Sequence, residues 1–540
     1  MKRTVLTLVL ILAAYHLFAV TYYVSTTGSD ARTKSEAQNI NTPWRTIQKA
    51  ANEVTAGDRI LIRGGTYYET IYLPSTCTGN AYGYITFEAY PGETVIIDQN
   101  NNGYVWIGIF VANNNDYLTF KRLNLRNGYF FGWLFENNCD HINIEDCSTL
   151  NTGASGIYVN NGKYIYIYRN VIDGACKSTN RRTNSQECIS LFNVTNFEVK
   201  YNEVKNAGGT TGGEGIDAKG NSAYGVISDN YVYNLAKNRG GIYVDSWDGY
   251  AHDIVIERNR VSNTMHGIMI AGEQGGTTSN ITIQNNICWK NQENGILLHY
   301  YGNGILQNIK IVNNTVYLNG VNTKKYSGGI WQQNTNPSTR DIIIRNNIVS
   351  SNLKFQIRND LANSSIIDYN LIHLFRNGTN ETKGTNYVEG DPQFVNPNYN
   401  DFHLKSTSPA INTGTSNQAP STDFDIVSRP QGTGFDIGAF EYIGTKAAET
   451  VSIEDSESAK NNISIYPNPA SEKVFIDLDA IADDNIMIEI YDVYGKCSYQ
   501  EVSNGRNHIE IRLDNLRKGL YFIKVHYNNK SSTISKLLVM

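Results

Sequence analysis

Charged side chains gather on neighbouring copies of a glycine–isoleucine phrase that recurs through the middle of the chain. Alternate residues of a β-strand face the same way. If the isoleucine of each copy points inward, the residues two before it, one after it and three after it point outward. Adjacent strands lie about 4.8 Å apart. The aligned copies therefore predict one contiguous outward patch, made of Glu187, Glu214, Asp217, Lys219 and Asp245.

Four carboxylates in one patch constrain the chemistry that it can do. They repel one another unless they are protonated, paired with cations or bound to a metal, and an oxygen-rich cluster of this kind suits Ca²⁺. The alternative is a solvated charged face in which Lys219 pairs with Asp245 on the next strand. Three charged columns that meet on the same copies, between mostly uncharged neighbours, favour a functional site.

Further polar and aromatic residues border the patch. The segment 176–187 is a basic loop beside the same strands, and over a groove it would favour a polyanionic chain. A solvent-exposed loop without function is the alternative. The two outward histidines have no zinc-type spacing, so we expect substrate contacts or a plain surface role. The candidate substrate-binding residues are Arg181, Arg182, Arg239, Trp247, His266 and His299.

A second recurring phrase positions these strands. It places two or three apolar residues before a paired turn, whose asparagines are Asn170, Asn202, Asn230, Asn259, Asn286, Asn314, Asn347 and Asn370, with Asp146 and Arg122 continuing the register upstream. Asparagine tolerates a left-handed corner, and stacked copies can hydrogen bond through their amides. Short β-branched strands with this corner predict an all-β, right-handed parallel β-helix. Leucine-rich repeats are excluded because both the leucine consensus and a helix in each repeat are missing.

Composition agrees with this architecture. The chain has 540 residues, with 46 glycines and 36 tyrosines, and its formal net charge is −5. Without a long basic run, nucleic acid is not an expected partner. Among the seven cysteines, Cys176 and Cys188 bracket the longest early insertion. A disulfide between them and two buried thiols remain equally open.

The ends of the chain carry targeting signals. Residues 1–19 have basic residues, an apolar run and a final small residue, which predicts a secretory signal peptide. We expect no transmembrane segment in the mature chain, because no other apolar run is long enough, and we expect a monomer. Residues 20–75 are predicted to cap the solenoid, with helical spacing at 44–54.

Two segments resemble known parts of secreted β-helix proteins. The phrase YYVSTTGSD…TPWRTIQKA…AGDRILIRGGTYYE is similar to the first segment of polysaccharide lyases and glycosidases with this fold, which implies a pectate-lyase-like solenoid. We place its coils at 76–372. Residues 373–443, which include FDIGAFEY, resemble a C-terminal cap segment of bacterial surface β-helix proteins. The polar stretch 444–462 is predicted to be a linker.

The last segment, 463–540, resembles the C-terminal sorting domain of the type IX secretion system of Bacteroidetes. The motifs YPNP, YDVYGK, LRKGLYFIKV and the terminal KLLV occur in order. The resemblance implies a small β-sandwich, the type IX secretion machinery as partner, and passage across the outer membrane. The protein is then expected to be secreted or held at the cell surface.

The phrase GGEGIDAKG at 212–220 is similar to the catalytic strand of alginate lyases and chondroitinase B, and it also resembles the family 9 pectate lyases, as VDSWDGY at 244–250 does. The resemblance implies that Lys219 is the catalytic base. The arginine that the first two families place one coil further on is absent, and Arg239 is a candidate stand-in. The ligands of Ca²⁺ that the resemblance implies are Glu187, Glu214, Asp217 and Asp245, with Asp248 at the margin.

The implied reaction is β-elimination on a uronate-containing polysaccharide. Calcium would neutralise the substrate carboxylate, Lys219 would abstract the C5 proton, and Tyr243 or a water would protonate the leaving oxygen. A lysine base needs a lowered pKa, which calcium would favour and Asp245 would oppose. The expected catalytic residues are Lys219, Glu214, Asp217, Tyr243 and Asp245.

Two other functions stay open at this point. A glycoside hydrolase needs two carboxylates about 5–5.5 Å apart for retention or roughly 6.5–9.5 Å apart for inversion, and Glu187 with Glu214, or Asp217 with Asp245, would provide them. A non-catalytic adhesin would instead use outward aromatic side chains to stack on sugar rings. Calcium dependence and an unsaturated product separate the lyase from the hydrolase.

Overall fold

The computed structural model divides the chain into two compact units, residues 1–445 and 446–540, which are described separately. In the first unit the structure describes residues 19–102, 107–177, 186–208, 212–235, 240–321, 326–361 and 365–444. In the second unit it describes 463–466, 470, 473–478, 486–492, 497–503, 508–513, 516, 519–527 and 531–539. The predicted signal peptide before Ala19 and the predicted linker after residue 444 lie outside the described residues.

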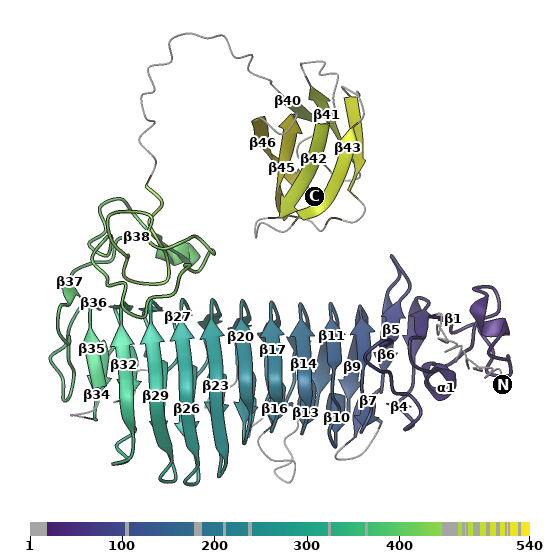
Figure 1. Cartoon of the computed structure of the whole chain (residues 1–540), viewed down its shortest axis with the longest axis horizontal. Coiled ribbons are helices and arrows are strands. Elements are labelled where there is room, and N and C mark those ends of the chain that lie inside the picture. Colours follow the sequence, from purple (N-terminus) through teal and green to yellow (C-terminus); the bar gives the residue numbers. More distant parts are fainter. Residues whose placement is uncertain are drawn as a thin grey trace, which may run out of the picture. The chain divides into compact units, whose positions relative to one another are not determined.

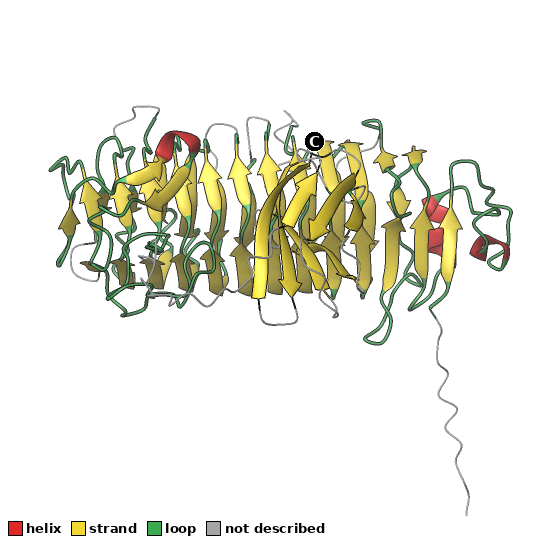
Figure 2. Cartoon of the chain, turned by 90° about the horizontal axis from the view of Figure 1, so that it is seen from above, coloured by secondary structure: helices red, strands yellow, loops and turns green. Residues whose placement is uncertain are grey.

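Three long parallel sheets run through the first unit, and each complete coil, from β2–β3–β4 to β32–β33–β34, contributes one strand to each sheet (Figures 1 and 2). This arrangement confirms the predicted right-handed parallel β-helix. Sheet 1 consists of β1 (Thr21–Val24), β2 (Arg59–Ile62), β5 (Ile85–Ala89), β8 (Leu118–Lys121), β11 (Ile142–Glu145), β14 (Lys163–Tyr168), β17 (Thr195–Lys200), β20 (Ala223–Ser228), β23 (Tyr250–Glu257), β26 (Thr277–Gln284), β29 (Ile305–Val312), β32 (Arg340–Arg345) and β35 (Ser365–Asp368).

Sheet 2 carries the glycine–isoleucine phrases and therefore the predicted site. It consists of β4 (Ile71–Tyr72), β7 (Gly108–Asn113), β10 (Phe131–Glu136), β13 (Ile157–Asn160), β16 (Ile189–Phe192), β19 (Ile216–Lys219), β22 (Gly240–Asp245), β25 (His266–Gly272), β28 (Asn294–Tyr300), β31 (Ile330–Gln332) and β34 (Ile357–Asn359). The phrase isoleucines, such as Ile216, Ile242 and Ile268, are fully buried in the core. Their inward direction was the premise of the outward columns, and it is confirmed.

Sheet 3 completes each coil. It consists of β3 (Gly65–Tyr67), β6 (Val95–Asp98), β9 (Leu123–Gly128), β12 (Ser148–Thr152), β15 (Val171–Asp173), β18 (Glu203–Lys205), β21 (Tyr231–Tyr233), β24 (Arg260–Ser262), β27 (Ile287–Trp289), β30 (Thr315–Tyr317), β33 (Ile348–Ser350), β36 (Leu371–His373) and β37 (Val388–Glu389). Isoleucine, valine and leucine from all three sheets form one continuous core along the coils.

A ladder of buried asparagines holds the corner between sheets 1 and 3. The Asn170 side-chain amide and backbone N–H both donate to Asn202 Oδ1, at 3.0 and 2.9 Å. The same pair of bonds repeats at every step to Asn370. Each amide is buried and hydrogen-bonded, which removes the cost of burying it. The predicted amide stacking is confirmed.

The register of this corner differs from the sequence prediction by one residue. The left-handed residue is the one before each ladder asparagine, for example Arg169, with φ of 56°. Upstream, the ladder position belongs to Cys147, whose backbone N–H donates to Asn170 Oδ1 at 2.9 Å. Asp146 and Arg122, which were expected to continue the asparagine register, are instead left-handed corner residues. The corner thus needs an asparagine for its amide rather than for its backbone conformation.

Short elements cover the first coils. Helix α1 (Ile47–Glu53) lies inside the segment where helical spacing was predicted, and a 3-10 turn, η1 (Glu36–Gln38), precedes it. The Thr46 side chain caps α1 by accepting from the Lys49 N–H at 3.1 Å. The Glu69 carboxylate accepts two further N–H groups of the first turn, so the orphan donors of this helix are satisfied.

The segment after the last coils turns back along the solenoid. It contains β38 (Phe394–Asn396), the 3-10 turn η3 (Pro397–Tyr399) and β39 (Asp401–Leu404). Its apolar side chains form a separate cluster against the outer side of sheet 3, where Phe402 contacts Trp289 with ring centroids 5.7 Å apart. The segment therefore lies beside several coils rather than only over the final one.

The second unit is small and antiparallel. One sheet consists of β40 (Ile463–Tyr466), β41 (Lys473–Leu478) and β44 (His508–Arg512), and the other of β42 (Ile486–Asp492), β43 (Cys497–Ser503), β45 (Gly519–Tyr527) and β46 (Ser531–Val539). The two sheets share a core of their own, as the predicted β-sandwich requires. No helix within the described residues of the chain is long and apolar enough to cross a membrane.

Candidate active site

The outward columns of sheet 2 align as predicted. On β19, Asp217 pairs with Tyr243 of the next strand, β22. Lys219, two residues further along β19, pairs with Asp245 of β22. Because these residues alternate with buried core positions, their side chains emerge on the same face. The strands β16, β19, β22 and β25 therefore form the floor of the predicted patch.

Lys219 is the centre of the cluster. Its ammonium lies 2.5 Å from Glu187 Oε1 and 3.8 Å from Asp217 Oδ2. The other oxygen of Glu187 accepts from the Ser190 hydroxyl at 2.6 Å. Burial alone would lower the pKa of Lys219, but the Glu187 and Asp217 carboxylates outweigh it and raise the pKa above its usual value. Glu187, expected as a metal ligand, is thus placed as the partner of the lysine.

Asp217 is a buried carboxylate whose negative charge is poorly compensated. It is 2% exposed, and its Oδ1 is buried without a hydrogen-bond partner among the described residues. Burial and the neighbouring Asp245 carboxylate raise the pKa of Asp217 well above its usual value. An ionised carboxylate here is poorly stabilised. It would be relieved by a proton or by a cation.

Asp245 is also a buried carboxyl group close to other acidic side chains. It is 4% exposed, and its Oδ1 accepts from the Trp247 N–H at 2.8 Å. Burial and the nearby Glu273 carboxylate raise the pKa of Asp245 to about 8, against the opposing effect of Lys219. The raised pKa favours the protonated form of Asp245, which can donate a hydrogen bond.

Glu273 is a site residue that the sequence columns missed. It follows β25 directly, and it accepts a hydrogen bond from the Tyr243 hydroxyl. Burial raises the pKa of Glu273. Burial, with Asp245 and Glu273 nearby, raises the pKa of Tyr243 well above its usual value, so the phenol stays protonated. Asp245 pairs with Ala271 of β25, and the same alternation carried two residues further would have pointed to Glu273.

The remaining predicted residues are more scattered. Glu214 is partly buried just before β19, while Asp248 and Trp247 lie on the turn after β22, where Trp247 is 48% exposed. His266 lies on β25, with Nδ1 3.2 Å from the Asn294 amide. His299 lies on β28, and burial lowers its pKa. The predicted substrate contacts Arg181, Arg182 and Arg239 lie outside the described residues.

The predicted calcium ion can be tested against these donors. Within the described ranges, no group of three or more histidine, cysteine, aspartate or glutamate side chains is arranged to hold a metal ion. Both oxygens of Glu187 are already engaged. The unpartnered Asp217 Oδ1 and the adjacent Asp245 are hard oxygen donors of the type that Ca²⁺ prefers. The chemistry of this pair fits calcium, and further oxygens from water or substrate would have to complete its shell.

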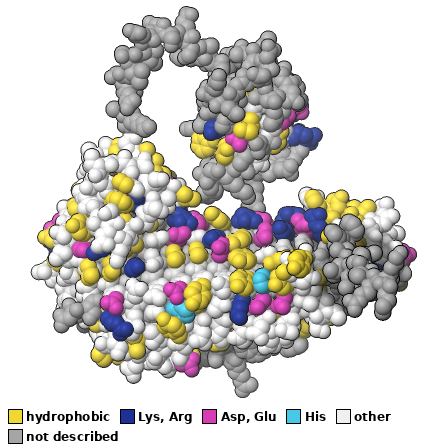
Figure 3. All heavy atoms as spheres, in the orientation of Figure 1, with side chains coloured by type: hydrophobic (Ala, Val, Ile, Leu, Met, Phe, Trp, Pro, Cys, Tyr) yellow, Lys and Arg dark blue, Asp and Glu magenta, His cyan; other side chains and the backbone are white. Residues whose placement is uncertain are grey.

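Charged side chains on another face of the first unit pair with one another. Figure 3 shows a row of basic and acidic side chains along one edge of the face over sheet 1. Left-handed corner residues take part, since Arg169 Nε lies 2.8 Å from Asp146 Oδ1 and Arg258 Nε lies 2.8 Å from Asp229 Oδ1. Each arginine reaches the coil before it. We infer that these ion pairs stabilise the stacking of the coils. Around Lys219 on sheet 2, by contrast, carboxylates outnumber the basic side chains.

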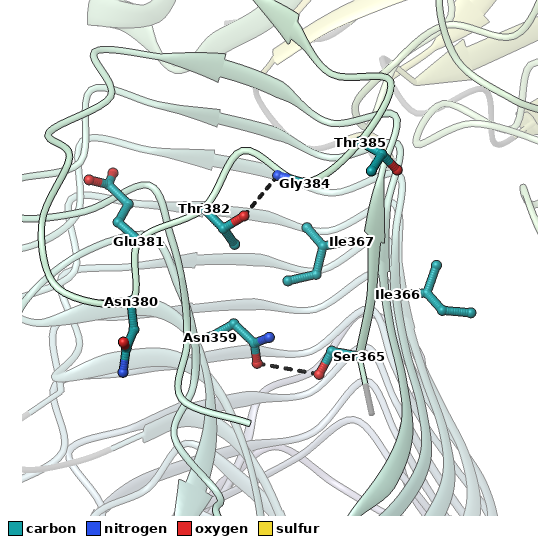
Figure 4. Close-up of a pocket in the computed structure, with 9 residues that line it drawn as sticks. All are labelled: Asn359, Ser365, Ile366, Ile367, Asn380, Glu381, Thr382, Gly384 and Thr385. Carbon is teal, nitrogen blue, oxygen red and sulfur yellow. Dashed lines mark hydrogen bonds between the residues drawn. The ribbon is translucent and has the colours of Figure 1, made fainter. Parts of the chain in front are cut away.

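A cavity of about 470 Å³ lies far along the chain from this cluster (Figure 4). Its one acidic residue, Glu381, accepts from the backbone N–H groups of Gln356, Arg376 and Gly378. That carboxylate serves the local turn and is not free for chemistry. We therefore place the candidate site at Lys219 rather than in the cavity. The lining residues are Asn359, Ser365, Ile366, Ile367, Asn380, Glu381, Thr382, Gly384 and Thr385.

Two thiols lie next to the cluster. Cys188 directly follows Glu187, and both Cys188 and Cys176 are buried free cysteines. The Cys176 thiol donates to the Gln186 carbonyl at 3.0 Å. Burial and the neighbouring Cys188 raise the pKa of Cys176 well above its usual value. Of the two alternatives for this pair, the structure has the buried thiols.

Comparisons with known proteins agree with the two-unit division. A family model for a secretion system C-terminal sorting domain matches residues 464–540, which confirms the predicted sorting domain and indicates export to the cell surface or secretion. A second model, described as a Pel9A-like, right-handed β-helix region, matches residues 22–347. This range contains every strand of the Lys219 cluster.

Individual proteins share low sequence identity with this chain or match only a short part of it. The uncharacterized protein YwoF of Bacillus subtilis is 27% identical over 460 residues, which covers 72% of this chain and 91% of that protein. Pectate lyase PEL9 of Emericella nidulans is 42% identical over 82 residues, or 15% of this chain and 19% of that protein. The crystal structure of pectate lyase Pel9A has a TM-score of 0.45 and 14% identity, over 78% of this chain and 96% of that one. From the match over more than half of its length, this chain belongs to the Pel9A-like right-handed β-helix family.

Proposed function

We propose that the protein is an exported polysaccharide lyase that cleaves a uronate-containing chain by β-elimination. The observation that carries the proposal is the position of Lys219 among Glu187, Asp217 and Asp245 on sheet 2. Family membership and the local similarity to a pectate lyase support the choice of reaction. The sorting domain supplies the route to an extracellular polymer.

In this proposal Lys219 removes the C5 proton of the uronate. The electron pair of the C–H bond forms the C4–C5 double bond, the C4–O4 bond breaks, and its electron pair leaves with the O4 oxygen. Tyr243, whose raised pKa keeps it protonated, or a water gives O4 its proton. The lysine must first lose its own proton, and Glu187 and Asp217 oppose that step while they are ionised.

We also propose a calcium ion held through Asp217 and Asp245. When bound, Ca²⁺ supplies positive charge that offsets the substrate carboxylate and the acidic floor. Without a cation, the carboxylates around the single lysine would repel a uronate polymer. Protonation of Asp217 and Asp245 and binding of a cation are alternative ways to relieve the same burial.

A hydrolase of the same fold is the second candidate. The observation in its favour is that Asp217 and Asp245 are buried on the neighbouring strands β19 and β22, where the raised pKa of Asp245 suits a general acid. Asp217 on the neighbouring strand would be the second carboxylate, and it would have to ionise to act as base or nucleophile, against the burial that raises its pKa. This reaction yields a new reducing end and no double bond, which separates it from elimination.

The test is ultraviolet absorbance of unsaturated uronate during incubation with pectate, alginate and glycosaminoglycans, each with calcium and with a chelator. We expect calcium-dependent growth of the signal, abolished by Lys219→Ala. Lys205→Ala is the matched control, because Lys205 also pairs with a glutamate but lies on sheet 3. Reducing-end release without the absorbance signal would replace the lyase with the hydrolase. A signal that survives in Lys219→Ala would remove Lys219 as the base.

A further inference from the structure

We propose that Glu273 is a positioning residue that holds the Tyr243 phenol in place for the reaction. The inference rests on the proposed function, because it assigns work to Tyr243. Its basis is the hydrogen bond from the Tyr243 hydroxyl to Glu273 Oε1. No other described hydrogen bond of the Tyr243 hydroxyl accompanies it.

The position of Tyr243 makes such a partner necessary. On one side, Tyr243 pairs with Asp217 of β19. On the other side, it pairs with Met269 of β25, an apolar residue that offers the hydroxyl no acceptor comparable to a carboxylate. The phenol reaches past Met269 to the carboxylate that follows the end of β25. Glu273 is thus the residue that draws the ring toward β25 and away from Asp217.

The competing acceptors define what is lost without Glu273. Asp217 faces Tyr243 on the next strand and Asp245 lies two residues along its own strand, and an oxygen of either side chain could accept a hydrogen bond from the phenol. A Tyr243 that turns toward them would lie across the floor beside Lys219. Displacement of a reacting group by about 1 Å can cost about 100-fold in rate. A hydrogen bond that fixes the position of the phenol therefore favours the reaction.

Burial strengthens the bond. Tyr243 is 6% exposed, and Glu273 is only partly exposed, so little water competes for either group. A hydrogen bond to a charged acceptor in such surroundings is stronger than one in water. Gln274, the next residue on the same turn, is exposed. It is a suitable neighbour for a control substitution.

The experiment is a kinetic double-mutant cycle of Tyr243→Phe, Glu273→Gln and the double variant, with Gln274→Asn as control. We expect Glu273→Gln to lower kcat about 10- to 100-fold with KM within about threefold. In the Tyr243→Phe background we expect the same change to cost less than about twofold. The control should match the wild-type protein. Equal losses in both backgrounds, or no loss in Glu273→Gln alone, would overturn the proposal.

Two further readouts keep this test separate from the proposed function. If the wild-type protein produces no unsaturated uronate, the lyase proposal fails, and the same cycle is measured on reducing-end release. Coupling there would still support Glu273 as the partner of Tyr243. The unfolding midpoints of the four proteins give the same cycle without turnover. Coupling in unfolding together with independent effects on turnover would make the contact structural only.

Discussion

Lys219 makes its closest ion pair with Glu187, 2.5 Å away, although Asp245 occupies the facing position on the next strand. Glu187 is 3% exposed and lies before β16, one coil earlier in the chain. The lysine is thus bound by a buried carboxylate on one side of β19. The β22 side of the floor is left to Asp245.

This pairing predicts the behaviour of Glu187→Gln. Without the carboxylate, one cause of the raised pKa of Lys219 is lost while the effect of burial remains, so the pKa falls. We expect the ascending limb of kcat/KM against pH to move to lower pH by about one unit or more. Ser190→Ala removes only the hydroxyl that supports Glu187 and should shift the limb less. An unmoved limb in Glu187→Gln would contradict Lys219 as the titrating base.

Asp245 predicts how stability depends on pH in the presence of a chelator. Its pKa is about 8 in the folded protein and far lower when unfolded. Between those values the folded state holds a proton that the unfolded state has lost, so the free energy of unfolding falls as pH rises. The slope from this one group is at most about 1.4 kcal/mol per pH unit. Asp245→Asn should flatten it.

The measurement is chemical unfolding of both proteins at pH 5, 6, 7 and 8. We expect the gain in stability of Asp245→Asn over the wild-type protein to be larger at pH 8 than at pH 5. Asp248→Asn, on the exposed turn of the same coil, is the control and should leave the slope unchanged. Parallel curves for Asp245→Asn and the wild-type protein would show that Asp245 is ionised throughout.

The asparagine ladder predicts a large cost for one interior amide. Asn259 accepts from the backbone N–H and the side-chain amide of Asn230, and it donates to Asn286. Asn259→Ala leaves buried donors of Asn230 unsatisfied, at about 1–3 kcal/mol each. We expect a loss of roughly 2–4 kcal/mol in the free energy of unfolding, measured with denaturant. Asn263→Gly, at an exposed left-handed corner of the same coil, should cost less than about 1 kcal/mol.

The paired cysteines predict a labelling pattern. Cys176 and Cys188 are buried, and the raised pKa of Cys176 disfavours the reactive thiolate. We expect neither to react with an alkylating reagent in the folded protein, and both to react after unfolding without reductant. Peptide mass spectrometry assigns the sites, and the buried free thiol of Cys288 is the internal control. Resistance of Cys176 and Cys188 after unfolding, when Cys288 has reacted, would reveal a disulfide.

Much of this architecture could be predicted because its signals repeat. The inward isoleucines, the outward columns of sheet 2 and the amide ladder each occur on many coils, so one misread copy does not change the result. That alignment alone predicts that Lys219 and Asp245 face each other in the backbone register of β19 and β22. A solenoid makes sequence spacing and spatial neighbourhood nearly equivalent, which ordinary globular folds do not.

The missed features depend on side chains and strand ends. Glu273 was overlooked because β25 runs to Gly272, beyond the four-residue phrase on which the columns were built. Lys219 pairs with Glu187 rather than with Asp245 because of the direction in which the side chains extend. The backbone register alone does not predict that direction. A second amide ladder, in which Asn291 donates to Asn319, lies after sheet 3 rather than in the paired turn of the recurring phrase, and was not predicted.

Successive ladder asparagines are separated by as few as 23 residues and as many as 33, yet their bonds keep the same length. The coil therefore keeps its helical phase whatever is inserted elsewhere in the turn. Long connections join strands of sheet 3 to strands of sheet 2, as from Asp173 at the end of β15 to Ile189 at the start of β16. Evolution can lengthen or exchange the segments there without refolding the scaffold. For the same reason, the connections from sheet 3 to sheet 2 are suitable places to engineer a new substrate specificity.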